Sequence, residues 1–177
     1  MSVEDDYDDE VTALYRKWVG RVQGFLINMG CDPGLAEEIA DDAFFGARRR
    51  WAHVRTLDQP EGYVFMIARN ERYKRQKTHD ARAKHLHPDP PGALRDGSDD
   101  PAPEVAEREM VRQALQQLPA RQREAVMLRD IGDLSEAAAA EIMGVSVGSV
   151  KGYTFKGRQR LRLLLTEFRD QRGGNDR

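Results

Sequence analysis

The sequence predicts an all-α protein of two small helical domains, joined by a flexible linker rich in proline and aspartate. In both halves, apolar residues recur at steps of three and four, the spacing of one helix face. Residues 87–103 hold five of the eight prolines and four aspartates, and cannot form a regular helix or strand. A length of 177 residues allows one ordinary domain or two small ones, and excludes a large multidomain enzyme.

The composition excludes several classes of protein. No run approaches the roughly 20 apolar residues that a membrane span needs, so no membrane insertion is predicted. Residues 1–10 carry six acids and no base, the opposite of a secretory signal, which predicts a cytoplasmic location. Cys31 is the single cysteine, which excludes an internal disulfide framework and a cysteine-cage metal site. We therefore predict neither a metal site nor a cofactor.

Positive charge is concentrated in two segments, although the net charge is only −2. Residues 69–84 hold seven bases and two acids, and residues 147–162 hold five bases and no acid. Such clusters are typical of proteins that bind the phosphate backbone of nucleic acids; the alternative is a solvated helix face. Residues 1–10 form a predicted acidic tail, whose charge would let it rest on one of these basic patches.

The first domain is predicted over residues 11–85 and contains three helices. The first buries a stripe that ends before Gly30: Val11, Leu14, Trp18, Val22, Phe25 and Met29. Asp32 is the predicted N-cap of the second helix, with Pro33 at its first position. One face of that helix is acidic and contains an aromatic residue: Glu38, Asp41, Asp42 and Phe45. The third helix begins at Pro60 and becomes basic after Ala68.

The second domain is predicted over residues 105–170, after a linker at 86–104 and before a C-terminal tail at 171–177. It consists of four helices, the second of which spans residues 121–131 after Pro119. Ser135 is the predicted cap of a short helix that ends at Met143, Gly144 provides a left-handed stop, and Ser146 caps a basic helix. A short helix, a tight glycine turn and a basic second helix make a helix-turn-helix.

No motif for catalysis is present. The chain lacks the G-x-x-x-x-G-K-[ST] loop, the H-E-x-x-H helix and the nucleophile elbow. We therefore predict that the protein is not an enzyme.

Three collinear blocks resemble the extracytoplasmic-function (ECF) sigma factors of bacterial RNA polymerase. Residues 32–51, DPGLAEEIADDAFFGARRRW, resemble the segment with which region 2 of the family binds the polymerase clamp helices. Residues 60–76, PEGYVFMIARNERYKRQ, resemble its promoter-melting and minus-ten helix. Residues 118–162 are similar to region 4, which reads the minus-thirty-five element. The resemblance implies an alternative sigma factor that binds core RNA polymerase and directs promoter-specific initiation.

The resemblance also implies roles for individual residues. The polymerase-binding residues would be Glu38, Asp41, Asp42 and Phe45. The residues that contact the melted minus-ten strand would be Tyr63, Arg69, Asn70, Arg72, Tyr73, Lys74 and Arg75. Asn70 matches the base-reading asparagine of the family, and the loop at 54–59 would wall a pocket for a flipped base. The residues that contact minus-thirty-five duplex DNA would be Ser146, Ser149, Lys151, Gly152, Tyr153, Lys156 and Arg158. An anti-sigma protein is a possible further partner.

The recognition helix departs from the family pattern at Gly152, Tyr153 and Phe155, which leaves the promoter preference open. Glycines at 152 and 157 also weaken an isolated helix, so we expect the recognition helix to be stably folded only when it is bound to DNA. Two other functions stay open on the sequence. A helix-turn-helix regulator would bind DNA without joining the polymerase, and a decoy would bind polymerase without reading promoters. The acidic face of the second helix distinguishes a polymerase-binding protein from a regulator, because a regulator that does not join the polymerase would not need this face.

Overall fold

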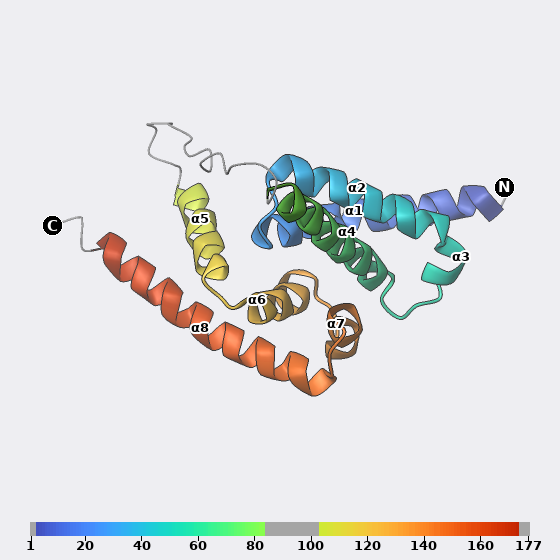
Figure 1. Ribbon diagram of the computed structural model, residues 1–177. Coiled ribbons are helices and arrows are strands. Elements are labelled where there is room, and N and C mark those ends of the chain that lie inside the picture. The colour runs from blue at the N-terminus through green and yellow to red at the C-terminus, as the bar shows by residue number, and fades with distance from the viewer. Residues whose placement is uncertain (1–2, 84–102, 174–177) are drawn as a thin grey trace.

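The computed structural model describes residues 3–83 and 103–173, and these residues form helices and turns without any strand (Figure 1). No helix in these two ranges is long and apolar enough to cross a membrane. The all-α fold class predicted from the sequence is confirmed. The predicted linker at 86–104 lies outside the described residues except for its last two, and the end of the predicted C-terminal tail, 174–177, also lies outside them.

The first domain contains α1 (Val3–Asn28), α2 (Pro33–Arg49), the short α3 (Trp51–Val54) and α4 (Pro60–Ala83). α1, α2 and α4 pack against one another, and α1 does so through most of the apolar stripe that the sequence predicted. Asp32 caps α2 as predicted, because its side chain accepts a hydrogen bond from the backbone N–H of Leu35 at 3.0 Å. Unlike the prediction, residues 3–10 form no separate tail, because α1 begins at Val3.

The second domain contains α5 (Pro103–Gln116), α6 (Ala120–Val126), η1 (Met127–Ile131), α7 (Glu136–Met143) and α8 (Val147–Gly173). The helix predicted over residues 121–131 is therefore α6 continued by one π-helical turn, η1. The long α8 runs along α5, α6 and α7 (Figure 1). The second domain extends beyond both of its predicted boundaries. Its first helix, α5, starts within the expected linker, and its last helix, α8, extends past residue 170.

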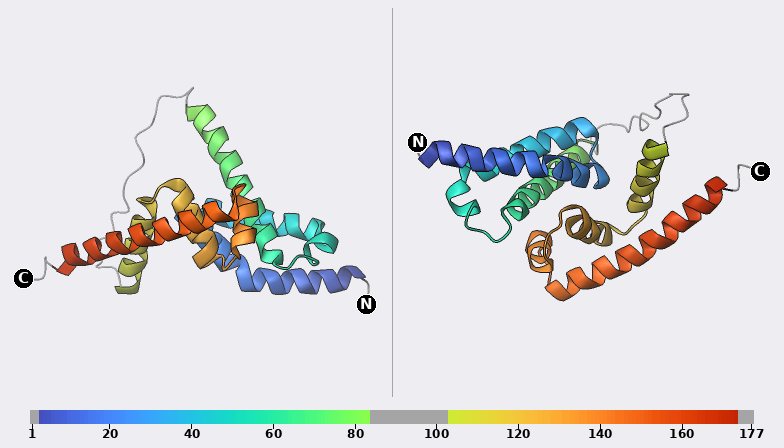
Figure 2. Two further views of the ribbon diagram at one scale, coloured as in Figure 1. Left: turned by 90° about the horizontal axis from the view of Figure 1, so that it is seen from below. Right: turned by 180° about the vertical axis from the view of Figure 1, so that it is seen from behind.

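The two domains pack against each other, which the sequence did not predict. η1 contacts α1, α7 contacts α4, and α5 contacts α1. Figure 1 and the right-hand view of Figure 2 show α6 and α7 between α8 and the first domain. One apolar cluster runs through both domains and includes Phe65 from α4 and Leu134 before α7. A smaller second apolar cluster, formed by Val11, Trp51 and Val54, packs α3 against α1.

Candidate nucleic-acid and protein interfaces

An acidic face with one aromatic ring lies on the solvent side of α2. Glu38, Asp41 and Asp42 are exposed, and the ring of Phe45 beside them exposes 59% of its surface. Steps of three and four residues place all four on one side of the helix, while Ile39 and its neighbours are buried on the other. The predicted polymerase-binding residues therefore form one accessible surface.

Two side chains from other helices order this acidic face. Arg75 of α4 forms ion pairs of 2.8 Å with both Glu38 and Asp42, and the hydrogen bond with Glu38 raises the pKa of the guanidinium. The Tyr15 hydroxyl donates to Asp41 at 3.1 Å, which raises the pKa of the phenol. In this structure Arg75 therefore contacts the acidic face, although the sequence assigned it to the minus-ten strand.

The other predicted minus-ten residues on α4 fall into two groups. Asn70 and Lys74 are exposed, and Lys74 forms a 3.5 Å ion pair with Glu71 of the same helix. Arg69 instead pairs with Glu124 of α6, and Arg72 donates to the backbone carbonyl of Met29. Both arginines lie over the ring of Tyr73, with guanidinium carbons 4.8 and 5.0 Å from its centroid. Arg72 therefore has a structural role at the end of α1.

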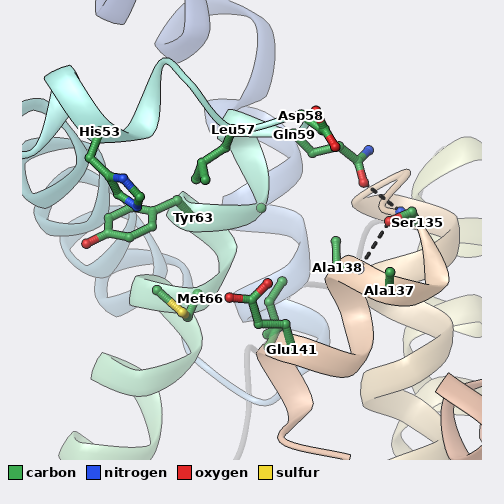
Figure 3. Close-up of a pocket in the computed structure, with 12 residues that line it drawn as sticks. His53, Leu57, Asp58, Gln59, Tyr63, Met66, Ser135, Ala137, Ala138 and Glu141 are labelled. Carbon is green, nitrogen blue, oxygen red and sulfur yellow. Dashed lines mark hydrogen bonds between the residues drawn. The ribbon is translucent and has the colours of Figure 1, made fainter. Parts of the chain in front are cut away.

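A pocket of about 330 Å³ lies beside α4, where the sequence predicted a site for a flipped base (Figure 3). The first domain lines it with His53, Leu57, Asp58, Gln59, Gly62, Tyr63 and Met66. The rings of His53 and Tyr63 meet edge to face, with centroids 6.3 Å apart. The opposite wall comes from the second domain, through Ser135, Ala137, Ala138, Glu141 and Ile142. The pocket thus combines an aromatic ring with polar groups, and helix α7 covers one of its sides.

The helix-turn-helix has the capping residues that the sequence predicted. The Ser135 hydroxyl accepts from the N–H of Ala138 at 3.1 Å, and the Ser146 hydroxyl accepts from the N–H of Ser149 at 3.1 Å. Gly144 has a φ of 64°, the left-handed conformation that ends α7. These three residues end α7 and begin the two helices of the helix-turn-helix, which contact each other.

The predicted minus-thirty-five residues do not all share one side of α8. Lys151, Gly152, Lys156 and Arg158 are exposed, while Tyr153 is half-buried and packs against the core. Lys151 forms a 3.5 Å ion pair with Glu136, and Arg158 pairs with Asp130. The hydrogen bonds with Asp130 raise the pKa of Arg158.

Three residues on the exposed side of α8 were not among the predicted DNA contacts, although the sequence had marked Phe155 as a departure from the family pattern. Phe155 exposes 63% of its surface, and with Gln159 and Arg162 it lines a groove that also includes Lys151. The steps of four, four and three from Lys151 to Arg162 could have identified this face. Its combination of cations with one aromatic ring suits contact with DNA.

The acidic residues at the start of α1 lie on bases of the first domain. Asp8 forms an ion pair with Arg48 at 2.7 Å, which holds the pKa of this carboxyl below its ordinary value. Glu10 accepts hydrogen bonds from Arg55 and, at 2.6 Å, from the indole N–H of Trp51. The acidic segment therefore contacts basic residues, but these are Arg48 and Arg55 and not the clusters at 69–84 or 147–162 on which the sequence predicted it to rest.

Cys31 is buried, and burial raises the pKa of its thiol above the ordinary value. Within residues 3–83 and 103–173, no three metal-ligating side chains gather as a metal site would require.

Comparison with known protein families gives two matches along the chain. Residues 14–82 match Sigma-70 region 2, and residues 108–161 match Sigma-70, region 4. The first match covers the acidic face of α2 and the basic α4, and the second covers the helix-turn-helix. A plain helix-turn-helix regulator would need only the second, so these matches favour a sigma factor over a regulator.

Two curated proteins are similar over nearly their whole length. The ECF RNA polymerase sigma factor SigM of Bacillus subtilis (strain 168) is 28% identical over 169 residues, which cover 94% of this chain and 98% of SigM. The RNA polymerase sigma factor CarQ of Myxococcus xanthus is 28% identical over 167 residues, 93% of this chain and 94% of CarQ.

Two solved structures share the fold. The sigma factor RpoE of Bartonella quintana, solved in complex with the anti-sigma factor NepR, has a TM-score of 0.65 at 24% identity. The match covers 91% of this chain and 97% of that one. CnrH, solved with the cytosolic domain of CnrY, has a TM-score of 0.59 at 18% identity over 90% of each chain.

The two regions occur in the family order, and the relatives align with both of them. The chain therefore belongs to the sigma-70 family and is an ECF sigma factor, an alternative sigma factor that binds core RNA polymerase and directs transcription from specific promoters.

Proposed function

We propose that each part of this activity is performed by a different surface of the chain. The acidic face of α2 is the surface that contacts core RNA polymerase. Glu38, Asp41 and Asp42 supply negative charge for a basic surface, and Phe45, one turn farther along the helix, supplies apolar area at the contact. The observation that carries the proposal is that this face and the basic faces lie on separate helices, so that one chain can contact polymerase and DNA together.

The exposed side of α4 and the pocket beside it read the melted minus-ten strand. Asn70 can form two hydrogen bonds with a base edge, and Lys74 provides a cation for the backbone. A base extruded from the duplex would enter the pocket and stack near Tyr63, with Gln59 in the wall. Arg69 and Tyr73 would contact the same strand once they leave their present partners.

The exposed face of α8 reads the minus-thirty-five duplex. Lys151, Lys156 and Arg158 supply phosphate or guanine contacts, and the N-terminal turn at Ser146 and Ser149 supplies backbone N–H groups. Phe155 lies among these cations, where an aromatic ring can contact thymine methyl groups. Because Tyr153 packs against the core, its role is to position the helix.

The chain performs no catalysis of its own, since the polymerase forms the RNA. It acts in the cytoplasm and lies on the nucleoid when bound to polymerase. An anti-sigma protein is a further proposed partner, supported by the solved relatives RpoE, crystallised with the anti-sigma factor NepR, and CnrH, solved with a domain of CnrY.

Transcription in vitro tests the proposal. Full-length protein with core polymerase and a promoter library should give defined start sites. Asn70→Ala should abolish initiation while retaining duplex binding, whereas Gln76→Ala, an exposed change on the same helix, should leave both intact. A chain that binds polymerase but gives no start site would be a decoy, and would contradict the proposal.

A further inference from the structure

We propose that Arg75 couples the two partners of the chain: in the free protein it neutralises the acidic face of α2, and polymerase binding releases it to the melted minus-ten strand. The inference rests on the proposed functions of α2 and α4, and it adds a link between them. Arg75 competes with polymerase at one surface and contacts DNA at the other.

The Arg75 side chain joins two neighbouring helices. It projects from α4, which packs beside α2 (Figure 1). One terminal nitrogen of its guanidinium lies 2.8 Å from Glu38, and the other lies 2.8 Å from Asp42. These carboxylates are four residues apart and occupy successive turns of one helix face, so the fork of a guanidinium can bind both at once. A single cation therefore covers two of the three acids on that face.

Partial exposure makes this contact reversible. The Arg75 side chain is 29% exposed, and those of Glu38 and Asp42 are exposed to 64% and 56%. Ion pairs with such access to water are weak, because water competes for both charges. Cations of a partner surface that also excludes water can therefore replace Arg75 at these two carboxylates.

A basic surface of polymerase would meet Arg75 at the acidic face. Its cations would approach the same two carboxylates, and like charges that share a site repel each other. Arg75 must therefore either leave its partners or oppose the polymerase, so bound polymerase favours the state in which it has left. Asp41 differs from its two neighbours, because it accepts a hydrogen bond from the neutral hydroxyl of Tyr15.

Released Arg75 supplies a cation to the minus-ten surface. It directly follows Lys74 in α4, and Lys74 and Asn70 are exposed one turn apart on the side that contacts DNA in the proposed function. An arginine side chain is long, and its guanidinium binds a phosphate as well as it binds a carboxylate. The released side chain thus adds one phosphate contact to that of Lys74.

Because one residue serves both surfaces, the two partners bind cooperatively. If polymerase favours the released state and DNA uses it, each partner raises the affinity for the other by the same factor. The free chain then binds single-stranded DNA less tightly than the chain on polymerase, since only the fraction of molecules with Arg75 released can use this contact.

Binding of the free chain to single-stranded DNA tests the release. The probe is a fluorescent pool of short oligonucleotides of random sequence, titrated by anisotropy at several salt concentrations. The double variant Glu38→Gln, Asp42→Asn frees Arg75 and should bind the pool roughly two- to tenfold more tightly. Its salt slope should be steeper by about 0.7, the value for one more phosphate contact on a single strand.

A matched pair of substitutions controls for the change in net charge. The variant Glu37→Gln, Asp9→Asn makes the same chemical changes at two other exposed acids of the first domain and should leave the salt slope unchanged. In the Arg75→Ala background, Glu38→Gln, Asp42→Asn should behave as this control does, because no arginine is left to release. A gain that the control matches, or one that persists without Arg75, would overturn the proposal.

The affinity for core RNA polymerase tests the competition. Arg75→Ala should bind core polymerase about three- to tenfold more tightly than the parent chain, because the competing cation is gone. Lys77→Ala removes an exposed positive charge from the same helix and should bind as the parent does. An arginine that merely held the acidic face in a productive geometry would give the opposite result, so equal or weaker binding by Arg75→Ala would also overturn the proposal.

The two experiments separate this inference from the proposed function. If Glu38→Gln, Asp42→Asn leaves the affinity for core polymerase unchanged, the acidic face is not the polymerase contact, and the coupling fails with it. If that variant loses polymerase affinity but Arg75→Ala gains none, the polymerase contact stands and only the coupling fails.

Discussion

Gly157 of α8 lies so close to Val126 of α6 that a Cβ built on it would be 2.7 Å from a methyl carbon of the valine, and 3.1 Å from the carbonyl oxygen of Gln122. The glycine that weakens an isolated helix therefore permits close packing of α8. This corrects the expectation that Gly152 and Gly157 both leave the recognition helix unstable in the absence of DNA.

Gly157→Ala is predicted to destabilise the protein by about 1–3 kcal/mol, the usual cost of overpacking. Gly152→Ala is the matched control, because a Cβ there meets nothing within 4 Å and should stabilise the exposed helix by about 0.5–1 kcal/mol. Urea unfolding followed by circular dichroism measures both. Equal shifts of the two midpoints in the same direction would contradict the packing argument.

The helix-turn-helix was predictable because its signals are local. Ser135, Gly144 and Ser146 act within a few residues of their positions, and the structure confirms all three as caps or stops. The packing of the two domains was not predictable, since Arg69 and Glu124 are 55 residues apart and either could have faced solvent. The helix at residues 3–10 was also missed, because the side chains that Asp8 and Glu10 contact, Arg48, Trp51 and Arg55, lie 40 or more residues later in the chain.

The Asp8–Arg48 pair predicts a dependence on pH. The hydrogen bond with Arg48 lowers the pKa of Asp8 in the folded chain below its ordinary value of 3.8. Its stabilising contribution is therefore fully present above about pH 4 and is lost as the pH falls through the lower folded-state pKa. Carbon-13 NMR titration of the Asp8 carboxyl should give a midpoint below 3.8.

Arg48→Ala should return that midpoint to the ordinary value, and Arg49→Ala, the exposed neighbour, should leave it low. A midpoint that does not respond to Arg48→Ala would show that the pair does not form in solution.

Phe155 provides a test of the recognition face. Because its ring is exposed, Phe155→Ala should change the free energy of unfolding by less than about 0.5 kcal/mol. Loss of its contacts should weaken binding to the preferred minus-thirty-five duplex about tenfold, within the range for one base contact. Leu163→Ala is the control, since Leu163 is exposed to 66% on the same helix but lies two turns farther along. Fluorescence anisotropy with a selected duplex compares them, and equal losses would exclude a specific role for Phe155.

The most direct test asks whether polymerase and DNA bind to separate faces of the chain. It measures the affinity of the full-length chain for core RNA polymerase in two separate variants, Phe45→Ala and Phe155→Ala. The two exposed rings lie on opposite functional faces, the acidic side of α2 and the basic side of α8. Phe45→Ala is predicted to weaken polymerase binding about tenfold, because aromatic residues are enriched among those whose truncation costs most at interfaces, and to leave duplex binding unchanged. Phe155→Ala should do the reverse. Polymerase binding that is insensitive to Phe45→Ala, or reduced equally by both substitutions, would contradict the account.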